Sequence, residues 1–306
     1  METNGITHLA IAGGTGKLGR LIINGFAYRA PRLRITLLVR QGSSNKAHAL
    51  VAGIARFSVR IVSFEDSGLQ DLADALAGHD GVLSVVGGSG LENAQMNLAR
   101  AAIRAEVKYF LPSQFGIDLN FGMNFLVREV DLKRQVRVLV KKHMHCIDIF
   151  CGFFSDEFLN EDFGWDLERH MVCVPGDGNK LCSFIDREDV ARYTVEVVLQ
   201  ASKYEGQALR FATATLSYND LVRIGEEVTG RLFTVTRASR LGAEGVTGDD
   251  LGFSNGQNSK AAQMQLVVAN GDAQVDALDY KLSNKLFPIV EPGSAEDSLR
   301  ALFGRQ

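Results

Sequence analysis

Short apolar runs and helical apolar patterns alternate along the first half of the chain. The apolar runs, which are typical of buried strands, lie at Leu9–Ala12, Leu33–Arg40, Val59–Phe64, Val82–Val86, Lys108–Leu111 and Ile147–Phe150. Between them, apolar residues recur every three or four positions, which predicts helices directly after the first run and at Leu69–Ala77, Gln95–Ala105 and Phe125–Lys142. Strands that alternate with helices in this way predict an α/β fold of Rossmann type, with a doubly wound parallel sheet covered on both faces.

The second half loses this strict alternation from about Ser155. Its patterns predict strands at Met171–Val174, Leu181–Ile185, Leu209–Thr213 and Leu232–Thr236, helices at Arg187–Gln200, Ser217–Val228 and Ala261–Asn270, and a glycine-rich loop over Gly242–Gly256. Ser217 and Asp220 have the spacing of a capping box. We therefore expect a first domain of Rossmann type over residues 1–155. A smaller, mainly substrate-binding C-terminal lobe is expected over residues 156–306, with part of 181–200 returning to the first domain.

A glycine-rich turn connects the first strand to the first helix. Gly14, Gly16 and Gly19 fit the GxGxxG pattern of dinucleotide-binding proteins. The first glycine of this pattern permits a tight turn, the second lets the backbone approach a diphosphate, and the third lets the helix pack on the strand. Free N–H groups and the positive dipole end of the helix favour the anion. The residues expected to hold it are Gly13, Gly14, Thr15, Gly16, Lys17, Leu18 and Gly19.

The end of the second strand indicates which dinucleotide binds. NAD-binding proteins usually carry a carboxylate there, which grips the ribose 2′-hydroxyl. This strand ends in Arg40, and no acidic residue occurs from Ala30 to Phe64. A guanidinium attracts the additional 2′-phosphate of NADP(H), and Lys46, in a predicted loop with Ser43 and Ser44, would add to that attraction. The alternative is that Arg40 simply points into water.

Three further features have two interpretations each. Gly87 and Gly88 follow the fourth strand and either approach a ribose of the cofactor or form a simple turn. The aromatic run that contains Phe153, Phe154 and Phe158 either packs as core under a loop or lines a substrate pocket. Lys133 lies beside the apolar face of its helix and is either a surface lysine, which is the interpretation favoured when it is taken alone, or a catalytic one.

Composition and charge narrow the classes of function. The 306 residues carry a net charge of −3, which offers no general attraction to nucleic acid or to an anionic membrane. No apolar run approaches the ~20 residues that cross a bilayer, no leader pattern precedes the first strand, and we expect a cytoplasmic protein. The four cysteines lack metal-ligand spacing and are expected to be reduced and buried. His143 and His145 have no nearby partners, so no metal site is expected.

Several motifs together resemble one family. GGTGKLGR, the strand that ends in Arg40, Lys46, LPSQFGID, the segment KRQVR from Lys133, GFF at Gly152 and PGDGNK follow one another in order. Between Ile6 and Val235 the sequence resembles the NmrA-like, isoflavone-reductase-like branch of atypical short-chain dehydrogenases/reductases. The departures are Gln114, where the family usually has glutamate, and Ala105-Glu106, where it usually has alanine and glycine.

The resemblance implies NADPH-dependent reduction with an active-site lysine, which by motif is Lys133. It implies that Arg40 and Lys46 contact the 2′-phosphate, that Ser113 and Phe115 contribute to the cofactor site, and that Phe154 lies near the nicotinamide or the substrate. We therefore expect a reductase that transfers hydride from NADPH to a hydrophobic or aromatic small molecule. The alternative is a non-catalytic NADP(H) sensor that acts through a protein partner. The sequence leaves open whether the chain forms a homodimer.

Overall fold

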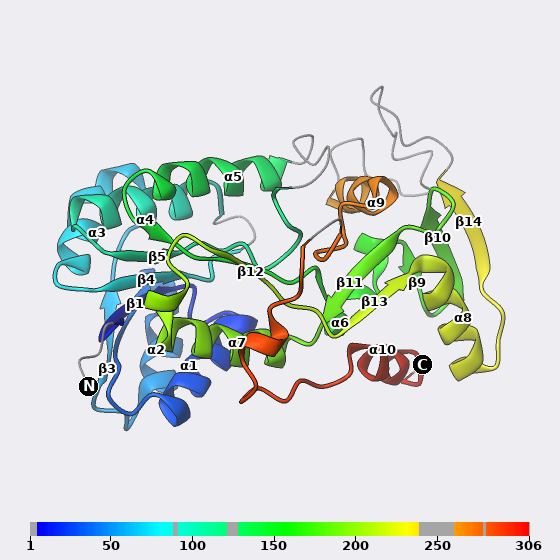
Figure 1. The fold of residues 1–306 in the computed structure, drawn as a ribbon, viewed down its shortest axis with the longest axis horizontal. Coiled ribbons are helices and arrows are strands. Elements are labelled where there is room, and N and C mark those ends of the chain that lie inside the picture. Colours follow the sequence, from blue (N-terminus) through cyan, green and yellow to red (C-terminus); the bar gives the residue numbers. More distant parts are fainter. Residues whose placement is uncertain (1–4, 88–90, 121–127, 239–259, 278–279, 306) are drawn as a thin grey trace. The chain divides into compact units, whose positions relative to one another are not determined.

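The chain divides into two compact units in the computed structural model, which describes residues 5–87, 91–120, 128–238, 260–277 and 280–305 (Figure 1). The first unit comprises Met1–Gln114, Arg128–Ile149 and Val190–Leu209. The second comprises Phe115–Val127, Phe150–Asp189 and Arg210–Gln306. Each unit therefore draws on segments that are distant in the sequence.

A six-stranded sheet forms the centre of the first unit. Its strands are β1 (His8–Ala12), β2 (Arg34–Val39), β3 (Phe57–Ile61), β4 (Gly81–Ser84), β5 (Tyr109–Leu111) and β6 (His145–Cys146). They lie in the order β3-β2-β1-β4-β5-β6, and all neighbouring strands are parallel. This is the strand order of dinucleotide-binding Rossmann folds, in which the direction of winding reverses between β1 and β4 and opens a crevice at their carboxyl ends. The predicted fold class is confirmed.

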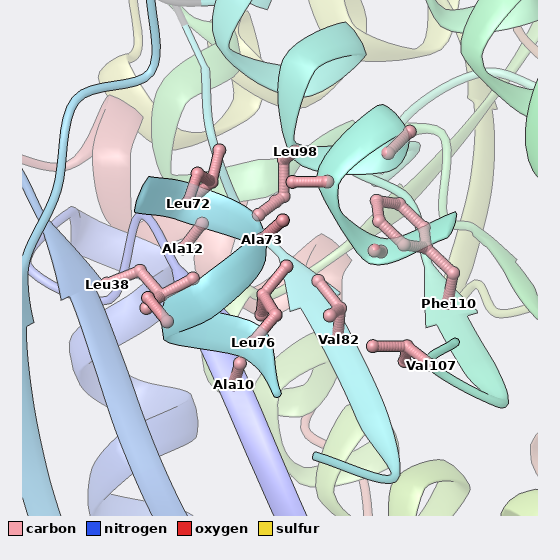
Figure 2. Close-up of a cluster of buried hydrophobic side chains, with 14 of the residues drawn as sticks. Ala10, Ala12, Leu38, Leu72, Ala73, Leu76, Val82, Leu98, Val107 and Phe110 are labelled. Carbon is pink, nitrogen blue, oxygen red and sulfur yellow. The ribbon is translucent and has the colours of Figure 1, made fainter. Parts of the chain in front are cut away.

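Helices cover both faces of this sheet (Figure 1). The helices α1 (Lys17–Arg29), α2 (Ser44–Val51) and α7 (Arg187–Leu199, within this unit from Val190) lie on one face, and α3 (Leu69–Leu76), α4 (Leu91–Arg104) and α5 (Arg128–Lys141) lie on the other. Arg29 on α1 pairs with Glu196 on α7 at 2.8 Å. Figure 2 shows how Leu72, Leu76 and Leu98 from α3 and α4 pack with Val82 of β4. The apolar face of each helix is therefore buried against the sheet, as the spacing of apolar residues predicts.

The second unit contains two small sheets and an aromatic core. One sheet has the order β14-β10-β9 (Thr234–Ala238, Met171–Pro175, Trp165–Asp166), and the other has the order β13-β11-β8 (Ala214–Ser217, Leu181–Ile185, Phe153–Phe154). Its helices are α6 (Ser155–Phe158), α8 (Tyr218–Thr229), α9 (Lys260–Asn270) and α10 (Ala295–Phe303). The predicted capping box between Ser217 and Asp220 is present at the start of α8.

Three sequence predictions of elements were wrong. Ile147–Phe150 does not join the large sheet, because β6 lies just before it and Asp148–Phe150 (β7) pairs with β12 (Ala208–Arg210) instead. Only the first two residues of the predicted strand Leu209–Thr213 lie in a strand, β12, and the next strand, β13, begins after it at Ala214. The predicted loop after Arg40 is a short 3-10 turn followed by α2. An apolar run indicates that a strand is buried but not which strand it pairs with. The predicted loop Gly242–Gly256 lies outside the described residues.

Candidate cofactor site

The turn after β1 has a geometry that only glycine tolerates. Gly13 takes φ of +84°, a left-handed conformation that strains residues with a Cβ. A Cβ at Gly13 would also lie 2.5 Å from the carbonyl oxygen of Val85, at the end of β4. The glycine in the left-handed conformation is therefore Gly13 and not Gly14, to which the sequence pattern assigned the tight turn. At Gly14 a Cβ would collide with Ile23 of α1 and Leu37 of β2.

The other two glycines serve the helix that follows. A Cβ at Gly19 would lie 2.4 Å from the carbonyl oxygen of Gly13, so its absence lets α1 pack onto the turn, as predicted. Gly16 is the N-cap of α1, has no side chain to bond the first turn, and is exposed. The first turn of α1 contains no acidic side chain. The amino end of this 13-residue helix thus presents backbone donors and a positive dipole end suited to a diphosphate.

A cleft of about 200 Å³ lies at the carboxyl ends of β1, β2 and β4. Its lining includes several predicted residues: Gly13, Thr15, Gly16, Arg40 and Gly87. It also includes Ser43, from the segment expected to add to the 2′-phosphate pocket, and residues that the sequence patterns did not single out: Leu38, Val39, Phe64, Val85, Val86 and Ala94. Apolar walls suit an adenosine, and the glycine turn and Arg40 suit its phosphates. Among the described lining residues none is acidic, so the lining itself places no carboxylate against a 2′-phosphate.

The remaining predicted cofactor residues lie outside this cleft or beyond the described residues. Lys17 and Lys46 are exposed on the first turns of α1 and α2, and neither is among the described lining residues. Leu18 is half-buried on α1. Gly88 lies outside the described residues. Phe115 belongs to the second unit. The cofactor roles of these residues stay predictions.

Lys133 lies on α5, and its side chain turns toward the residues that follow β5. Its half-buried ammonium donates a hydrogen bond to the main-chain carbonyl of Gln114 at 3.1 Å. Gln95 on α4 accepts a hydrogen bond from the N–H of Ser113 at 2.5 Å. Both hydrogen bonds lie within the first unit, at the carboxyl end of the parallel sheet, where ligands bind in Rossmann folds.

A comparison with models of protein families shows the family of the chain. The model of the NmrA-like family matches residues 7–270 of the chain. The chain belongs to the NmrA-like family. The predicted resemblance is thereby confirmed over most of the sequence.

Individual relatives of this NmrA-like chain are reductases or reductase homologues from plants. The isoflavone reductase homolog A622 of Nicotiana glauca is 26% identical over 234 residues, which are 73% of this chain and 74% of that protein. Pinoresinol reductase 2 of Arabidopsis thaliana is 26% identical over 251 residues, which are 76% of this chain and 78% of that protein. The binary complex of leucoanthocyanidin reductase with NADPH from Vitis vinifera superposes with a TM-score of 0.75 at 20% identity, and the match covers 98% of this chain and 100% of that chain. This last likeness establishes a shared fold.

The aromatic residues of the second unit lie mainly in its core. Phe158 is 0% exposed, and its ring centroid lies 4.5 Å from that of Phe163 and 4.8 Å from that of Phe184. Phe153 is also buried and contacts Phe158 at 5.1 Å between ring centroids. Phe154 is half-buried, with the guanidinium of Arg187 5.0 Å from its ring. The burial of Phe153 and Phe158 fits the core interpretation, and their role in substrate binding stays a prediction.

The described part of the chain also bears on the predictions about its cysteines, metal ligands and membrane-spanning segments. All four cysteines are free and buried, as predicted, and burial raises the pKa of the Cys146 and Cys173 thiols. No cluster of three or more His, Cys, Asp or Glu side chains suited to a metal ion occurs among the described residues. None of the described helices is both long and apolar enough to span a membrane.

Proposed function

We propose that this protein is an NADPH-dependent reductase of an aromatic or other hydrophobic small molecule, with Lys133 at its active site. The observation that carries the proposal is the cleft of the first unit, in which the glycine turn and Arg40 meet. The relatives described above support the substrate class, since their names refer to isoflavone, pinoresinol and leucoanthocyanidin. NADPH, when bound, would supply the hydride.

The cleft fits the two charged parts of NADPH. The exposed N-cap Gly16 leaves open the approach to the first turn of α1, which suits the diphosphate. Arg40 lies at the end of β2, where a 2′-phosphate is expected, and it is exposed and lines the cleft. A guanidinium binds phosphate through charge-assisted hydrogen bonds. The first turn of α1 suits either dinucleotide, and Arg40 favours NADPH over NADH.

Lys133 can manage the charge that the reduction creates. Hydride addition to a polarised carbon leaves negative charge on a neighbouring oxygen, which a positioned ammonium can stabilise or protonate. The hydrogen bond from Lys133 to Gln114 holds this ammonium in one orientation.

Turnover of NADPH by a lysine variant tests the proposal. The purified protein is incubated with NADPH and, in turn, with pinoresinol, an isoflavone and a leucoanthocyanidin, and the loss of NADPH absorbance is followed. We expect Lys133→Met to abolish turnover of any compound that wild-type protein reduces, while NADPH still binds. Lys142→Met serves as the control, because Lys142 is exposed and lies after the end of α5. Turnover that survives in Lys133→Met would refute the role of the lysine.

The same experiment separates a reductase from a cofactor sensor. Tight NADPH binding without turnover of any compound, together with a protein partner whose binding depends on NADPH, would favour the regulatory alternative. Residence in the cytoplasm and the absence of a nucleic-acid partner stay predictions from the sequence.

A further inference from the structure

A buried glutamine lies on the apolar face of α4. Gln95 is 0% exposed, and Leu98, Ala99 and Ala102, which follow it at helical spacing, are core residues. An amide is costly to bury unless it forms hydrogen bonds. The Oε1 atom of Gln95 accepts the bond from the Ser113 N–H, just after β5. Its Nε2 atom has no hydrogen-bond partner among the described residues. The sequence thus places a hydrogen-bonding side chain at a buried position where packing alone would favour a leucine.

Gln114, which follows Ser113, contacts Lys133 through both its main chain and its side chain. Its main-chain carbonyl accepts the hydrogen bond from the Lys133 ammonium at 3.1 Å. Its side-chain Nε2 lies 3.5 Å from the main-chain carbonyl oxygen of Lys133. Gln114 is 1% exposed, and its Oε1 atom is buried without a hydrogen-bond partner among the described residues. The residue therefore connects the segment after β5 to the backbone and to the ammonium of one residue on α5.

We propose that Gln95 and Gln114 are positioning residues for the Lys133 ammonium. This inference rests on the proposed function, in which that ammonium acts on the substrate. Gln95 fixes the peptide at Ser113, so that the next carbonyl, that of Gln114, keeps a constant direction. The Gln114 amide holds α5 at this carbonyl without adding a charge. A neutral residue at position 114 adds no charge of its own beside this carbonyl.

Two described charged residues of α5 near Lys133 have partners of their own. On α5 itself, Asp131 accepts a hydrogen bond from Gln135, and Arg137 pairs with the buried Asp148 at 2.6 Å. Arg134 follows Lys133 directly on α5 and is half-buried. The hydrogen bonds described above that involve α4 and the segment after β5 are formed by neutral groups. These are the side-chain amides of Gln95 and Gln114 and the N–H of Ser113. A negative charge at position 114 would therefore add a new electrostatic interaction.

Gln114→Glu tests the proposal through the protonation of Lys133. Gln114 is the residue whose main-chain carbonyl accepts the bond from the Lys133 ammonium. A nearby opposite charge favours the charged form of an ionisable group, so we expect the pH midpoint for acetylation of Lys133 by acetic anhydride to rise by about one pH unit. Mass spectrometry of the Lys133 peptide across a pH series measures this midpoint in the full chain. Gln70→Glu is the matched control, because Gln70 is exposed on α3 and contacts Asp74. A midpoint in Gln114→Glu equal to that of wild type overturns the proposal.

Gln95→Met provides a second test that does not depend on a buried charge. Methionine has a similar length, but its thioether sulfur is only a weak acceptor for the Ser113 N–H. We expect kcat for NADPH oxidation, with whichever of the three compounds wild type reduces, to fall about tenfold, while the Kd for NADPH and the melting temperature change little. An unchanged kcat overturns the positioning role of Gln95.

The failure of this inference and the failure of the proposed function give different results. If Lys133→Met is inactive but Gln95→Met and Gln114→Glu match wild type in kcat and in acetylation midpoint, positioning is wrong and the reductase proposal stands. If Lys133→Met remains active, the function assigned to the lysine is wrong, and the inference about its role in catalysis falls with it.

Discussion

Substitution of two glycines in the same turn separates a structural role from a binding role. Gly13→Ala places a Cβ on a residue with φ of +84°, and this Cβ would lie 2.5 Å from the Val85 carbonyl oxygen. The left-handed conformation costs about 1–2 kcal/mol for a residue with a side chain. The contact is with backbone, so β4 must move, and overpacking of this kind costs about 1–3 kcal/mol. We therefore expect the free energy of unfolding to fall by roughly 2–5 kcal/mol.

Gly16→Ala should leave the stability of the fold nearly unchanged and weaken the binding of NADPH. Gly16 has φ of −73° and ψ of 174°, which alanine adopts without strain, and its Cβ would approach only the Gly13 carbonyl oxygen, at 3.3 Å. Loss of glycine at an N-cap costs less than about 1 kcal/mol. The added methyl group lies where the diphosphate is expected to approach α1, so we expect the Kd for NADPH to rise about tenfold or more.

Thermal unfolding and calorimetric titration with NADPH measure the two effects. For a chain of this size, each kcal/mol corresponds to a shift of about 2–4 °C, so Gly13→Ala should lower the melting temperature by roughly 4–20 °C. Gly16→Ala should unfold within a few degrees of wild type and bind NADPH weakly. The reasoning is refuted if Gly13→Ala is as stable as wild type, or if Gly16→Ala binds NADPH with unchanged affinity.

Two further predictions concern stability. Asp148→Ala removes the buried carboxylate that Arg137 and Lys141 contact at 2.6 and 3.5 Å. Because both cations are partly exposed, we expect a loss of about 2–4 kcal/mol in urea unfolding, and a loss below about 1 kcal/mol would contradict the pairing. His8 and His79 stack with ring centroids 3.7 Å apart, and burial lowers the pKa of both below 6.5. The unfolded chain then binds more protons than the folded one below that value, so the free energy of unfolding should fall between about pH 7 and pH 5.5, less steeply in His79→Gln. A flat wild-type dependence would contradict this assignment.

The parallel sheet and the glycine turn could be predicted because the spacing of apolar residues and of glycines along the sequence is enough to indicate them. The apolar face of α1 and the run Leu9–Ala12 are both buried, and burial is what hydrophobic periodicity reports. The turn glycines lie between these two elements, which gives the motif its specificity. Arg40 at the end of β2 could likewise be placed from the strand pattern, and it lines the cleft.

Other features depend on contacts that no local pattern reports. Asp148 lies inside the apolar run Ile147–Phe150, and its burial depends on the ion pair with Arg137 of α5, a contact that no spacing of residues predicts. Phe64 lines the cleft only because the segment after β3 returns there. Gln95 did leave a signal, since it is a polar residue in register with Leu98 and Ala102 on one helix face.

Calorimetric titration of NADPH and of NADH into wild-type protein and into Arg40→Ala tests the central claim most directly. The cleft at the carboxyl ends of β1, β2 and β4 predicts that wild type binds NADPH at least about tenfold more tightly than NADH. It also predicts that Arg40→Ala loses most of this preference and keeps its affinity for NADH. Equal affinity of wild type for the two dinucleotides, or no binding of either, would contradict the account.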